Sequence, residues 1–360
     1  MRLCFAMAAV ALLLARAMAA DPPKTPDVAR NDAGPPVPEL TIRPPAPAVI
    51  QSEAETLLER ARRLSDIRGL DSPPFRLKAD FTFIGDELET FAGSYTEYWV
   101  SDSKWRKEIV VGERKRVDIA GAKNVWEIDT EPLLPDKAWR IVQALSPFPA
   151  RSLKVEYAAV KDAPTRAGVR CALTKSAGAS RAQSAFCFDQ AYGVLVEHII
   201  PQWGRYNLTD IACVYGGFQK FGGQWFPRDV ECRQGGHRQM EAHVTELAMD
   251  ESGDPARFDP PPGATELDRC DGGIVAPKAD YTPTPPPPLG MRDAASWTVL
   301  LRMVIDANGK PQNVQVVRPG NKSFDEAAAR AAEHWRFKPA TCDGQPIVQR
   351  IEFEIGSRSY

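Results

Sequence analysis

The sequence has little of what catalysis or metal binding usually requires. Four histidines occur in 360 residues, and no serine lies in a Gly-x-Ser-x-Gly turn. No Cys-x-x-Cys pair is present, and His237 and His243 stand six positions apart at an expected strand edge, a spacing that does not suit a metal centre. We therefore expect no enzymatic activity, no cofactor and no metal site.

The sequence also lacks an excess of positive charge. Lys and Arg total 45 and Asp and Glu total 47, which gives a formal net charge of −2, and no basic stripe follows the chain. Proteins that bind nucleic acid usually gather Lys and Arg on one face. Gly216-Gly217 and Gly222-Gly223 precede no helix start, so they fit turns better than a phosphate-binding loop. Nucleic acid is therefore not an expected partner.

No apolar run is long enough for a typical membrane helix, which needs about 20 residues. The apolar run from Leu3 to Ala15 is shorter and is followed by Arg16. Arg2 before the run and Ala17-Met18-Ala19 after it are typical of a secretory signal peptide. We predict that residues 1–20 are a signal peptide and that the protein is periplasmic. An inner-membrane anchor formed by an uncleaved N-terminus is the alternative.

Cysteine is sparse but even in number after the export segment. Seven cysteines occur, and Cys4 lies before the predicted cleavage site, which leaves six. An even number in an exported chain favours disulfides. Many pairings are open, and we favour neighbours along the chain: Cys171 with Cys187, Cys213 with Cys232, and Cys270 with Cys342. The last pair would limit how far the C-terminal region moves from its tether.

Proline is concentrated in two stretches that divide the chain. Residues 21–50 are rich in proline and almost free of aromatic residues, which predicts a disordered linker. Residues 283–288 contain five prolines and predict a stiff spacer within a second linker at residues 263–288. Two folded domains are expected between and after them, at residues 51–262 and 289–360.

Hydrophobic periodicity predicts that the first domain is rich in β-strands. Apolar residues at steps of three and four predict an amphipathic helix over Glu53–Leu70. From Phe75 the period changes to two, and candidate strands continue to Met249, with a helix expected at Lys137–Leu145. This pattern predicts an α+β chain whose first domain is a mainly antiparallel, incomplete β-barrel with a covering helix.

The C-terminal region from Trp297 to Tyr360 predicts a small α+β domain. Asn308-Gly309 is typical of a tight hairpin turn, and Ser323 is a candidate helix cap. The expected elements are a strand at 296–305, a return strand at 312–317, a helix at 324–335 and a final strand at 347–355.

Five short motifs in this region resemble the TonB C-terminal domain family. They are Asp306-x-x-Gly309, Asn313-Val314-Gln315-Val316-Val317, Asp325-x-Ala327-Ala328, Trp335-Arg336-Phe337-x-Pro339-Ala340 and Asp343-Gly344-x-Pro346. The resemblance implies a small sheet packed against helices, with an edge strand that pairs with an extended segment of an outer-membrane receptor. It also implies a role in energy-coupled transmembrane transport.

If this resemblance holds, the final strand binds the partner. The expected partner-binding residues are Ile347, Val348, Gln349, Arg350, Ile351, Glu352 and Phe353. Backbone pairing would supply affinity, and the side chains of Gln349, Arg350 and Glu352 would bias the choice of partner.

A second resemblance covers residues 54–262. It rests on Phe218-x-x-Phe221-Gly222-Gly223-x-Trp225-Phe226-Pro227-Arg228, Val244-x-Glu246-Leu247 and Arg257-Phe258-x-Pro260-Pro261, which are similar to the closing strands of the periplasmic lipoprotein-carrier (LolA-like) fold. The resemblance implies a concave apolar face that holds a lipid or an acyl chain. The tryptophans of this region either line such a pocket or form ordinary core: Trp99, Trp105, Trp126, Trp139, Trp203 and Trp225.

Two functions therefore compete. One is a TonB-family protein of the cell envelope that binds an outer-membrane receptor or another envelope protein through its final strand. The alternative is a periplasmic protein that binds lipid or another hydrophobic ligand in its first domain. A purely structural role in the envelope predicts neither ligand nor receptor.

Overall fold

The computed structural model describes residues 47–69, 72–85, 88–130, 132–148, 156–163, 166–175, 184–200, 210–250, 254–270, 274–283, 285 and 298–356. The predicted signal peptide, the first linker up to residue 46, most of the tract at 283–288 and Trp203 lie outside the described residues. The side chains of residues 47–52, 136, 156–159 and 175 are also outside the description.

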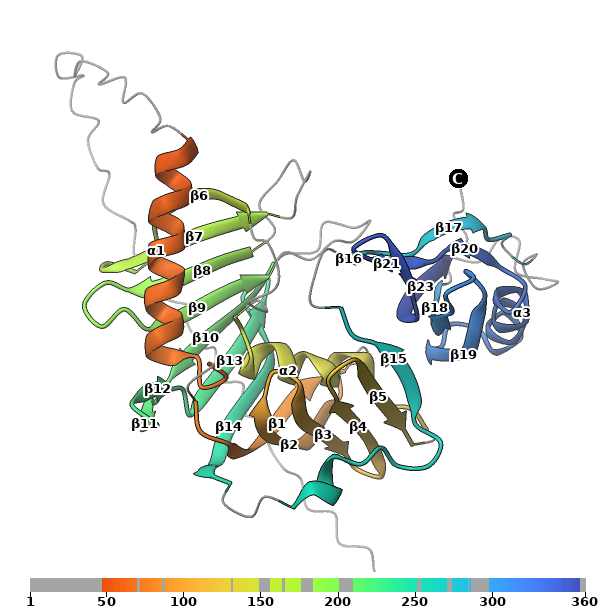
Figure 1. Cartoon of the computed structure of the whole chain (residues 1–360), viewed down its shortest axis with the longest axis horizontal. Coiled ribbons are helices and arrows are strands. Elements are labelled where there is room, and N and C mark those ends of the chain that lie inside the picture. Colours follow the sequence, from red (N-terminus) through yellow and green to blue (C-terminus); the bar gives the residue numbers. More distant parts are fainter. Residues whose placement is uncertain are drawn as a thin grey trace, which may run out of the picture. The chain divides into compact units, whose positions relative to one another are not determined.

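Thirteen strands form one large antiparallel sheet (Figure 1). Their spatial order is β15-β5-β4-β3-β2-β1-β14-β13-β10-β9-β8-β7-β6. The bounds are β1 (Phe75–Ile84), β2 (Thr90–Ser101), β3 (Lys104–Val111), β4 (Arg114–Ala120), β5 (Asn124–Asp129), β6 (Glu156–Asp162), β7 (Val169–Lys175), β8 (Ser184–Asp189), β9 (Leu195–Ile200), β10 (Ile211–Gly216), β13 (Asp229–Gln234), β14 (His237–Met249) and β15 (Thr265–Asp268).

The sheet is open. Its two end strands, β15 and β6, do not pair with each other. The predicted combination of many strands and few helices is confirmed. The expected incomplete barrel is only partly found, because the strands form an antiparallel sheet that does not close into a barrel. Strand β1 pairs with β14 over its length, from Phe75 opposite Met249 to Phe83 opposite Met240.

Two helical segments cover one face of this sheet. Helix α1 (Pro47–Ser65) crosses strands β6 to β9, and η1 (Asp136–Trp139) leads into α2 (Arg140–Leu145) over the other part of the sheet (Figure 1). Ala54, Leu58 and Ala61 from α1 and Ile141 and Leu145 from α2 join one hydrophobic core. The predicted amphipathic helix is confirmed, and it ends at Ser65 instead of Leu70.

One predicted strand is divided. The sequence pattern of residues 224–233 predicts a single strand, but these residues form β12 (Gln224–Phe226), which pairs with β11 (Gln219–Phe221), and then β13. Pro227 lies at the break and has no N–H to donate to a ladder. Gly222 and Gly223 form the β11–β12 turn with φ of 56° and 88°, which agrees with their predicted role as turn glycines.

The C-terminal domain has a three-stranded sheet in the order β19-β18-β23, with β18 (Thr298–Ile305), β19 (Pro311–Arg318) and β23 (Gln349–Gly356). Helix α3 (Lys322–Ala332) packs on it, and Trp335 is buried in the shared core. Short strands β20 (Arg336–Lys338), β21 (Ala340–Cys342) and β22 (Gln345–Ile347) complete the domain.

The predicted hairpin turn between β18 and β19 is confirmed. Gly309 has φ of 79°, and its N–H donates to the carbonyl oxygen of Asp306. A Cβ at this position would lie 1.8 Å from the carbonyl oxygen of Phe337. Glycine is therefore required by the close approach of β20 as well as by the turn itself.

The predicted cap of α3 is wrong. Asn321, not Ser323, caps the helix, because its Oδ1 accepts hydrogen bonds from the backbone N–H groups of Ser323 and Phe324. Asp325, expected in the first turn, is nearly buried and accepts from the N–H of Gly320. Serine and asparagine are both common at the N-cap position, so the residue that caps α3 is decided by where the preceding loop ends.

Part of the segment expected to be a linker forms strands. Strand β15 pairs with β5 at the end of the large sheet. Strand β16 (Ile274–Val275) pairs with β21, and β17 (Lys278–Tyr281) pairs with β20. The indole N–H of Trp335 donates to the carbonyl oxygen of Pro283. The segment from 265 to 283 therefore contacts both domains.

The three favoured cysteine pairs are all formed: Cys171–Cys187, Cys213–Cys232 and Cys270–Cys342. The first two join directly opposed residues of paired strands, β7 with β8 and β10 with β13. The third joins the segment after β15 to β21 of the C-terminal domain, with its Cα atoms 5.7 Å apart.

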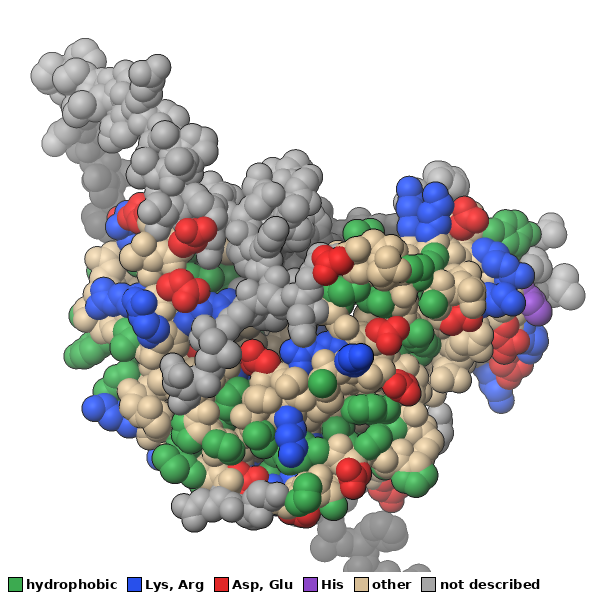
Figure 2. Space-filling model, viewed as in Figure 1, with side chains coloured by type: hydrophobic (Ala, Val, Ile, Leu, Met, Phe, Trp, Pro, Cys, Tyr) green, Lys and Arg blue, Asp and Glu red, His purple; other side chains and the backbone are tan. Residues whose placement is uncertain are grey.

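On the face drawn in Figure 2, Lys and Arg are interspersed with acidic and apolar side chains, and the described residues form no continuous basic band there. Within the described ranges, no helix has the length and apolar character to cross a membrane.

Candidate functional site

The final strand β23 is an outer strand of its sheet. It pairs with β18 in a regular antiparallel register from Ile305 opposite Gln349 to Thr298 opposite Gly356. In the described part of the chain, no strand pairs with its other edge. A strand in this position presents one row of backbone N–H and C=O groups to the outside.

The direction of these backbone groups follows from Val348. Its N–H and its C=O both bond to Asp268, on the side of the strand away from β18. In an antiparallel pair both groups of a residue point to the same side, and the side alternates along the strand. The register has no shift along β23, so Arg350, Glu352 and Glu354 also present their backbone groups outward.

The side chains of β23 divide between two faces. Ile351, Phe353 and Ile355 pack into the core of the domain, where the Phe353 ring lies 4.9 Å from that of Trp335 in an edge-on contact. On the other face, Glu352 pairs with Arg302 of the adjacent strand β18, and Glu354 pairs with Arg318 of β19.

The seven predicted partner-binding residues are contiguous, but they do not share one strand. Ile347 ends β22, Val348 lies between the two strands, and Gln349 to Phe353 begin β23. Among the described residues, no strand pairs with their outer edge from Arg350 onward. Before Arg350, the edge is hydrogen-bonded to Asp268 through Val348.

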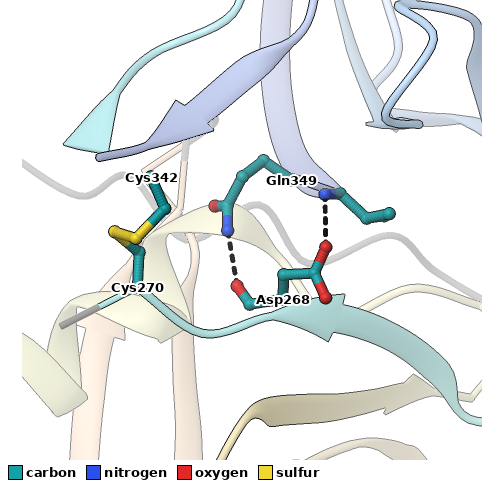
Figure 3. Close-up of a disulfide and its surroundings, with 5 residues drawn as sticks. Asp268, Cys270, Cys342 and Gln349 are labelled. Carbon is teal, nitrogen blue, oxygen red and sulfur yellow. Dashed lines mark hydrogen bonds between the residues drawn. A yellow bond between two sulfur atoms is a disulfide. The ribbon is translucent and has the colours of Figure 1, made fainter. Parts of the chain in front are cut away.

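Asp268 occupies the beginning of this edge (Figure 3). The N–H of Val348 donates to Asp268 Oδ2 at 2.7 Å, and the N–H of Asp268 donates to the Val348 carbonyl oxygen at 3.1 Å. The side-chain amide of Gln349 donates to the Asp268 carbonyl oxygen at 2.7 Å. We call these three hydrogen bonds the Asp268 clamp.

The Cys270–Cys342 disulfide lies beside this clamp (Figure 3). Cys270 follows Asp268 by two residues, and Cys342 belongs to β21. On its other side Asp268 is the last residue of β15, opposite Asn124 of β5. Sequence reasoning missed Asp268, because it lies in a segment that had been assigned to a linker and carries no motif.

A group of charged side chains joins the two domains next to the clamp. Arg302 of β18 lies 3.1 Å from Asp129 Oδ2, and Arg350 of β23 lies 2.6 Å from Glu127 Oε2. Arg116 of β4 contacts both of these carboxylates, Glu127 at 2.9 Å and Asp129 at 3.5 Å. Arg116 and Arg302 are buried, and Glu127, Asp129 and Arg350 are partly buried. The pairs made by Arg302 and Arg350 need both domains in place, whereas those of Arg116 lie within the large sheet.

Burial dominates the protonation behaviour of these carboxylates. It raises the pKa of Glu127, to which repulsion from Asp118 adds, while Arg116 and Arg350 act in the opposite direction. Burial also raises the pKa of Asp129 against the attraction of Arg116 and Arg302. Arg116, Arg302 and Arg350 therefore offset only part of the cost of burying these two carboxylates.

A second candidate site is a cavity in the larger domain, with a volume of about 770 Å³. It lies between the ends of α1 and α2 and the strands beneath them. Trp99 and Trp105, two of the six tryptophans considered above, line it. The other apolar and aromatic lining includes Leu145, Phe148, Leu195, Tyr215, Phe218 and Phe226.

The cavity also has polar groups. Arg68 forms a buried ion pair with Glu97, which also accepts a hydrogen bond from Tyr95. Burial acts against the charge of Glu97, but Arg68 and Lys107 outweigh it and hold the pKa of Glu97 below its usual value. Arg68 lines the cavity as a paired cation and supports its wall.

The remaining candidate residues of the sequence stand apart from both sites. Trp139 packs on the large core, Trp225 on a smaller cluster behind the sheet, and Trp126 is half-buried on β5. His243 pairs with Asp229 at 2.7 Å, and His237 begins β14 in an exposed position. Among the described residues, no group of three or more His, Cys, Asp or Glu side chains is arranged to hold a metal ion.

The C-terminal domain resembles a known protein family. Residues 287–356 match the family model described as Gram-negative bacterial TonB protein C-terminal. Protein TonB of Xanthomonas campestris pv. campestris (strain B100) is 34% identical over 70 residues, which are 19% of this chain and 31% of that protein. Protein tonB2 of Pseudomonas aeruginosa is 40% identical over 62 residues, 17% of this chain and 23% of that protein. The chain thus spans less than a third of the length of these relatives.

Solved structures that resemble more than half of the chain include a LolA superfamily protein from Nitrosomonas europaea. It is 9% identical with a TM-score of 0.39, and the match covers 57% of this chain and 97% of that one. A putative outer membrane lipoprotein-sorting protein domain from Vibrio parahaemolyticus matches with 11% identity and a TM-score of 0.34, over 57% of this chain and 97% of that one.

The segment that matches the family model contains the sheet around β18 and the buried Trp335. Residues 287–356 are thus similar to the C-terminal domains of Gram-negative bacterial TonB proteins.

Proposed function

We propose that this protein acts in the cell envelope and that its C-terminal domain binds an extended segment of an outer-membrane or other envelope protein by pairing along β23. The observation that carries the proposal is the outward row of backbone groups at Arg350, Glu352 and Glu354 on a strand with one open edge. Addition of a strand to such an edge is a general mode of peptide recognition. The three disulfides support an oxidising compartment such as the periplasm.

The test uses one position on β23 with a matched control. Glu354→Pro removes an outward N–H, and Glu354→Val keeps the N–H but removes the same carboxylate and its ion pair with Arg318. Both variants and the parent chain are titrated with ten-residue peptides tiled along envelope proteins of the source bacterium.

The expected result is that peptides bound by the parent chain bind Glu354→Val with similar affinity and Glu354→Pro about tenfold more weakly. If no tiled peptide binds the parent chain, or if the bound peptides do not distinguish the two variants, pairing along β23 is wrong.

A second candidate function is binding of a hydrophobic ligand such as a lipid or an acyl chain in the larger domain. The specific observation that favours it is the cavity of about 770 Å³ with Trp99, Trp105 and Phe148 in its wall. Its size lies in the usual range for small-molecule sites.

Trp105→Ala and Trp225→Ala separate this function from general stability. Trp105 lines the cavity, whereas Trp225 packs on the cluster formed around Cys171 and Cys187. Binding of a fluorescent fatty acid should weaken several-fold in Trp105→Ala and change little in Trp225→Ala. Absence of binding by the parent chain would rule the cavity out as a fatty-acid site.

A further inference from the structure

The Asp268 clamp makes the same kind of contact that a partner strand would make. It engages both the N–H and the C=O of Val348, at 2.7 and 3.1 Å. A partner strand paired along the whole predicted site would need these two groups, because they point away from β18. Asp268 and such a strand therefore cannot bind Val348 at the same time.

The open edge begins two residues later. Arg350, Glu352 and Glu354 present the next outward backbone groups, and among the described residues no strand covers them. About seven residues of edge, from Arg350 to Gly356, are thus available to another chain while the clamp is closed.

The clamp is held from two sides. Strand β15 fixes Asp268 to β5 of the large sheet, and the N–H of Arg269 donates to the Lys123 carbonyl oxygen at 2.8 Å. The Cys270–Cys342 disulfide then ties the same segment to the C-terminal domain. An opened clamp would stay close to Val348, so that it competes with a partner as part of the same molecule.

We infer that Asp268 is an autoinhibitory contact that shortens the docking edge of β23 and admits a longer partner strand only when the clamp opens. This inference rests on the proposed function of β23. It assigns to the segment after the large sheet a role in controlling the C-terminal domain, in addition to joining the two.

The partner that fits this edge is a short extended segment with basic side chains at alternate positions. Glu352 and Glu354 are the more exposed members of their ion pairs with Arg302 and Arg318, and Ile351 and Phe353 lie toward the other face of β23. Opposite charges on neighbouring strands attract each other across a sheet. Two synthetic probes follow this pattern: acetyl-(Lys-Val)₃-amide, which the open edge can hold, and acetyl-(Lys-Val)₅-amide, which is long enough to reach Val348.

The experiment compares the full chain with Asp268→Ala and Asp268→Asn. Alanine removes the acceptor for the Val348 N–H, whereas asparagine keeps a side-chain oxygen of the same reach. The longer probe should bind Asp268→Ala about tenfold more tightly than the parent chain, and Asp268→Asn within about twofold of it. The shorter probe should bind all three chains within about twofold.

Hydrogen exchange checks that the fold is kept. The Val348 amide should exchange faster in Asp268→Ala, while amides in the β18–β23 ladder, such as that of Met303, should keep their protection. A chain with both Cys270→Ser and Cys342→Ser keeps Asp268 but loosens its attachment, and it should shift the binding of the longer probe in the same direction.

The possible failures differ. Equal binding of the longer probe to the parent chain and Asp268→Ala, or an equal gain for the shorter probe, would overturn the clamp and leave docking on β23 in place. If neither probe binds Asp268→Ala while its β18–β23 ladder stays protected, docking on β23 fails for this class of partner, and the inference fails with it.

Discussion

At the scale of single residues, the burial of His198 makes the stability of the fold depend on pH. It lies on β9 against the Phe186 ring, 4.4 Å between ring centroids, and neither ring nitrogen has a hydrogen-bond partner in the described part of the chain. Burial lowers the pKa of His198 to about 4. An unfolded histidine has a pKa of about 6.5, so the unfolded chain takes up this proton first. The contribution to stability is complete above about pH 6.5 and is lost as the pH falls toward 4.

His198→Phe should remove this pH dependence. Between pH 7 and pH 4 the free energy of unfolding of the parent chain should fall by about 3 kcal/mol more than that of the variant, as measured by urea unfolding. His237→Phe serves as the control, because it makes the same replacement at an exposed position. The same profile in His198→Phe and the parent chain would show that His198 is not the group responsible.

Single residues were also the hardest to predict. Asn321 and Asp268 both act through hydrogen bonds to nearby backbone groups, and such bonds depend on loop geometry that no periodicity encodes. The cysteines could be paired because both residues of Cys171–Cys187 and of Cys213–Cys232 fall in expected neighbouring strands.

At the scale of elements, the sequence predicted whether a segment forms a helix or a strand better than it predicted where that segment begins and ends. Strand β1 and helix α1 have clear periods of two and of three to four residues, and both are present. Boundaries were less certain where a backbone group is missing or a strand ends in a loop, as at Pro227. The C-terminal domain followed closely at β18, β19 and most of β23, because turn residues and apolar alternation agree there.

The turn between β18 and β19 offers a test at this scale. Gly309→Ala adds a Cβ that would overlap the Phe337 carbonyl oxygen, whereas Gly344→Ala meets open space at a similar positive φ. Gly344→Ala should lower the free energy of unfolding by about 1 kcal/mol, which is the cost of the backbone conformation alone. Gly309→Ala should cost about 3 kcal/mol or more, because backbone atoms must also move. Thermal unfolding that ranks the two variants equally would contradict the steric argument.

At the scale of the whole molecule, contacts between distant segments decide how the two domains are joined. The pairing of β15 with β5, the clamp on Val348 and the pairs Arg302–Asp129 and Arg350–Glu127 all connect residues at least 80 positions apart. Each of these residues is ordinary in its local sequence. The sequence therefore predicted two domains and a disulfide between them, but not the buried charges at their junction.

Replacing an arginine that joins the two domains should lower the free energy of unfolding strongly. Arg302→Met removes a cation from Asp129, which is largely buried, and from the more exposed Glu352, and we expect the free energy of unfolding to fall by about 3 kcal/mol in a denaturant titration. Arg318→Met removes a more exposed pair on the same sheet and should cost less than about 1 kcal/mol. Similar losses in both variants would mean that the junction adds no special stability.

The pairing of β1 with β14 has a consequence for biosynthesis. Phe75 and Met249 are neighbours in the finished sheet, although 174 positions separate them. Until β14 is in place, β1 has a neighbour on one side only and exposes a row of backbone groups on the other. For a chain that folds after export, this state lasts until residues 237–249 have also crossed the membrane, so a chain truncated before residue 237 should aggregate unless a chaperone binds it.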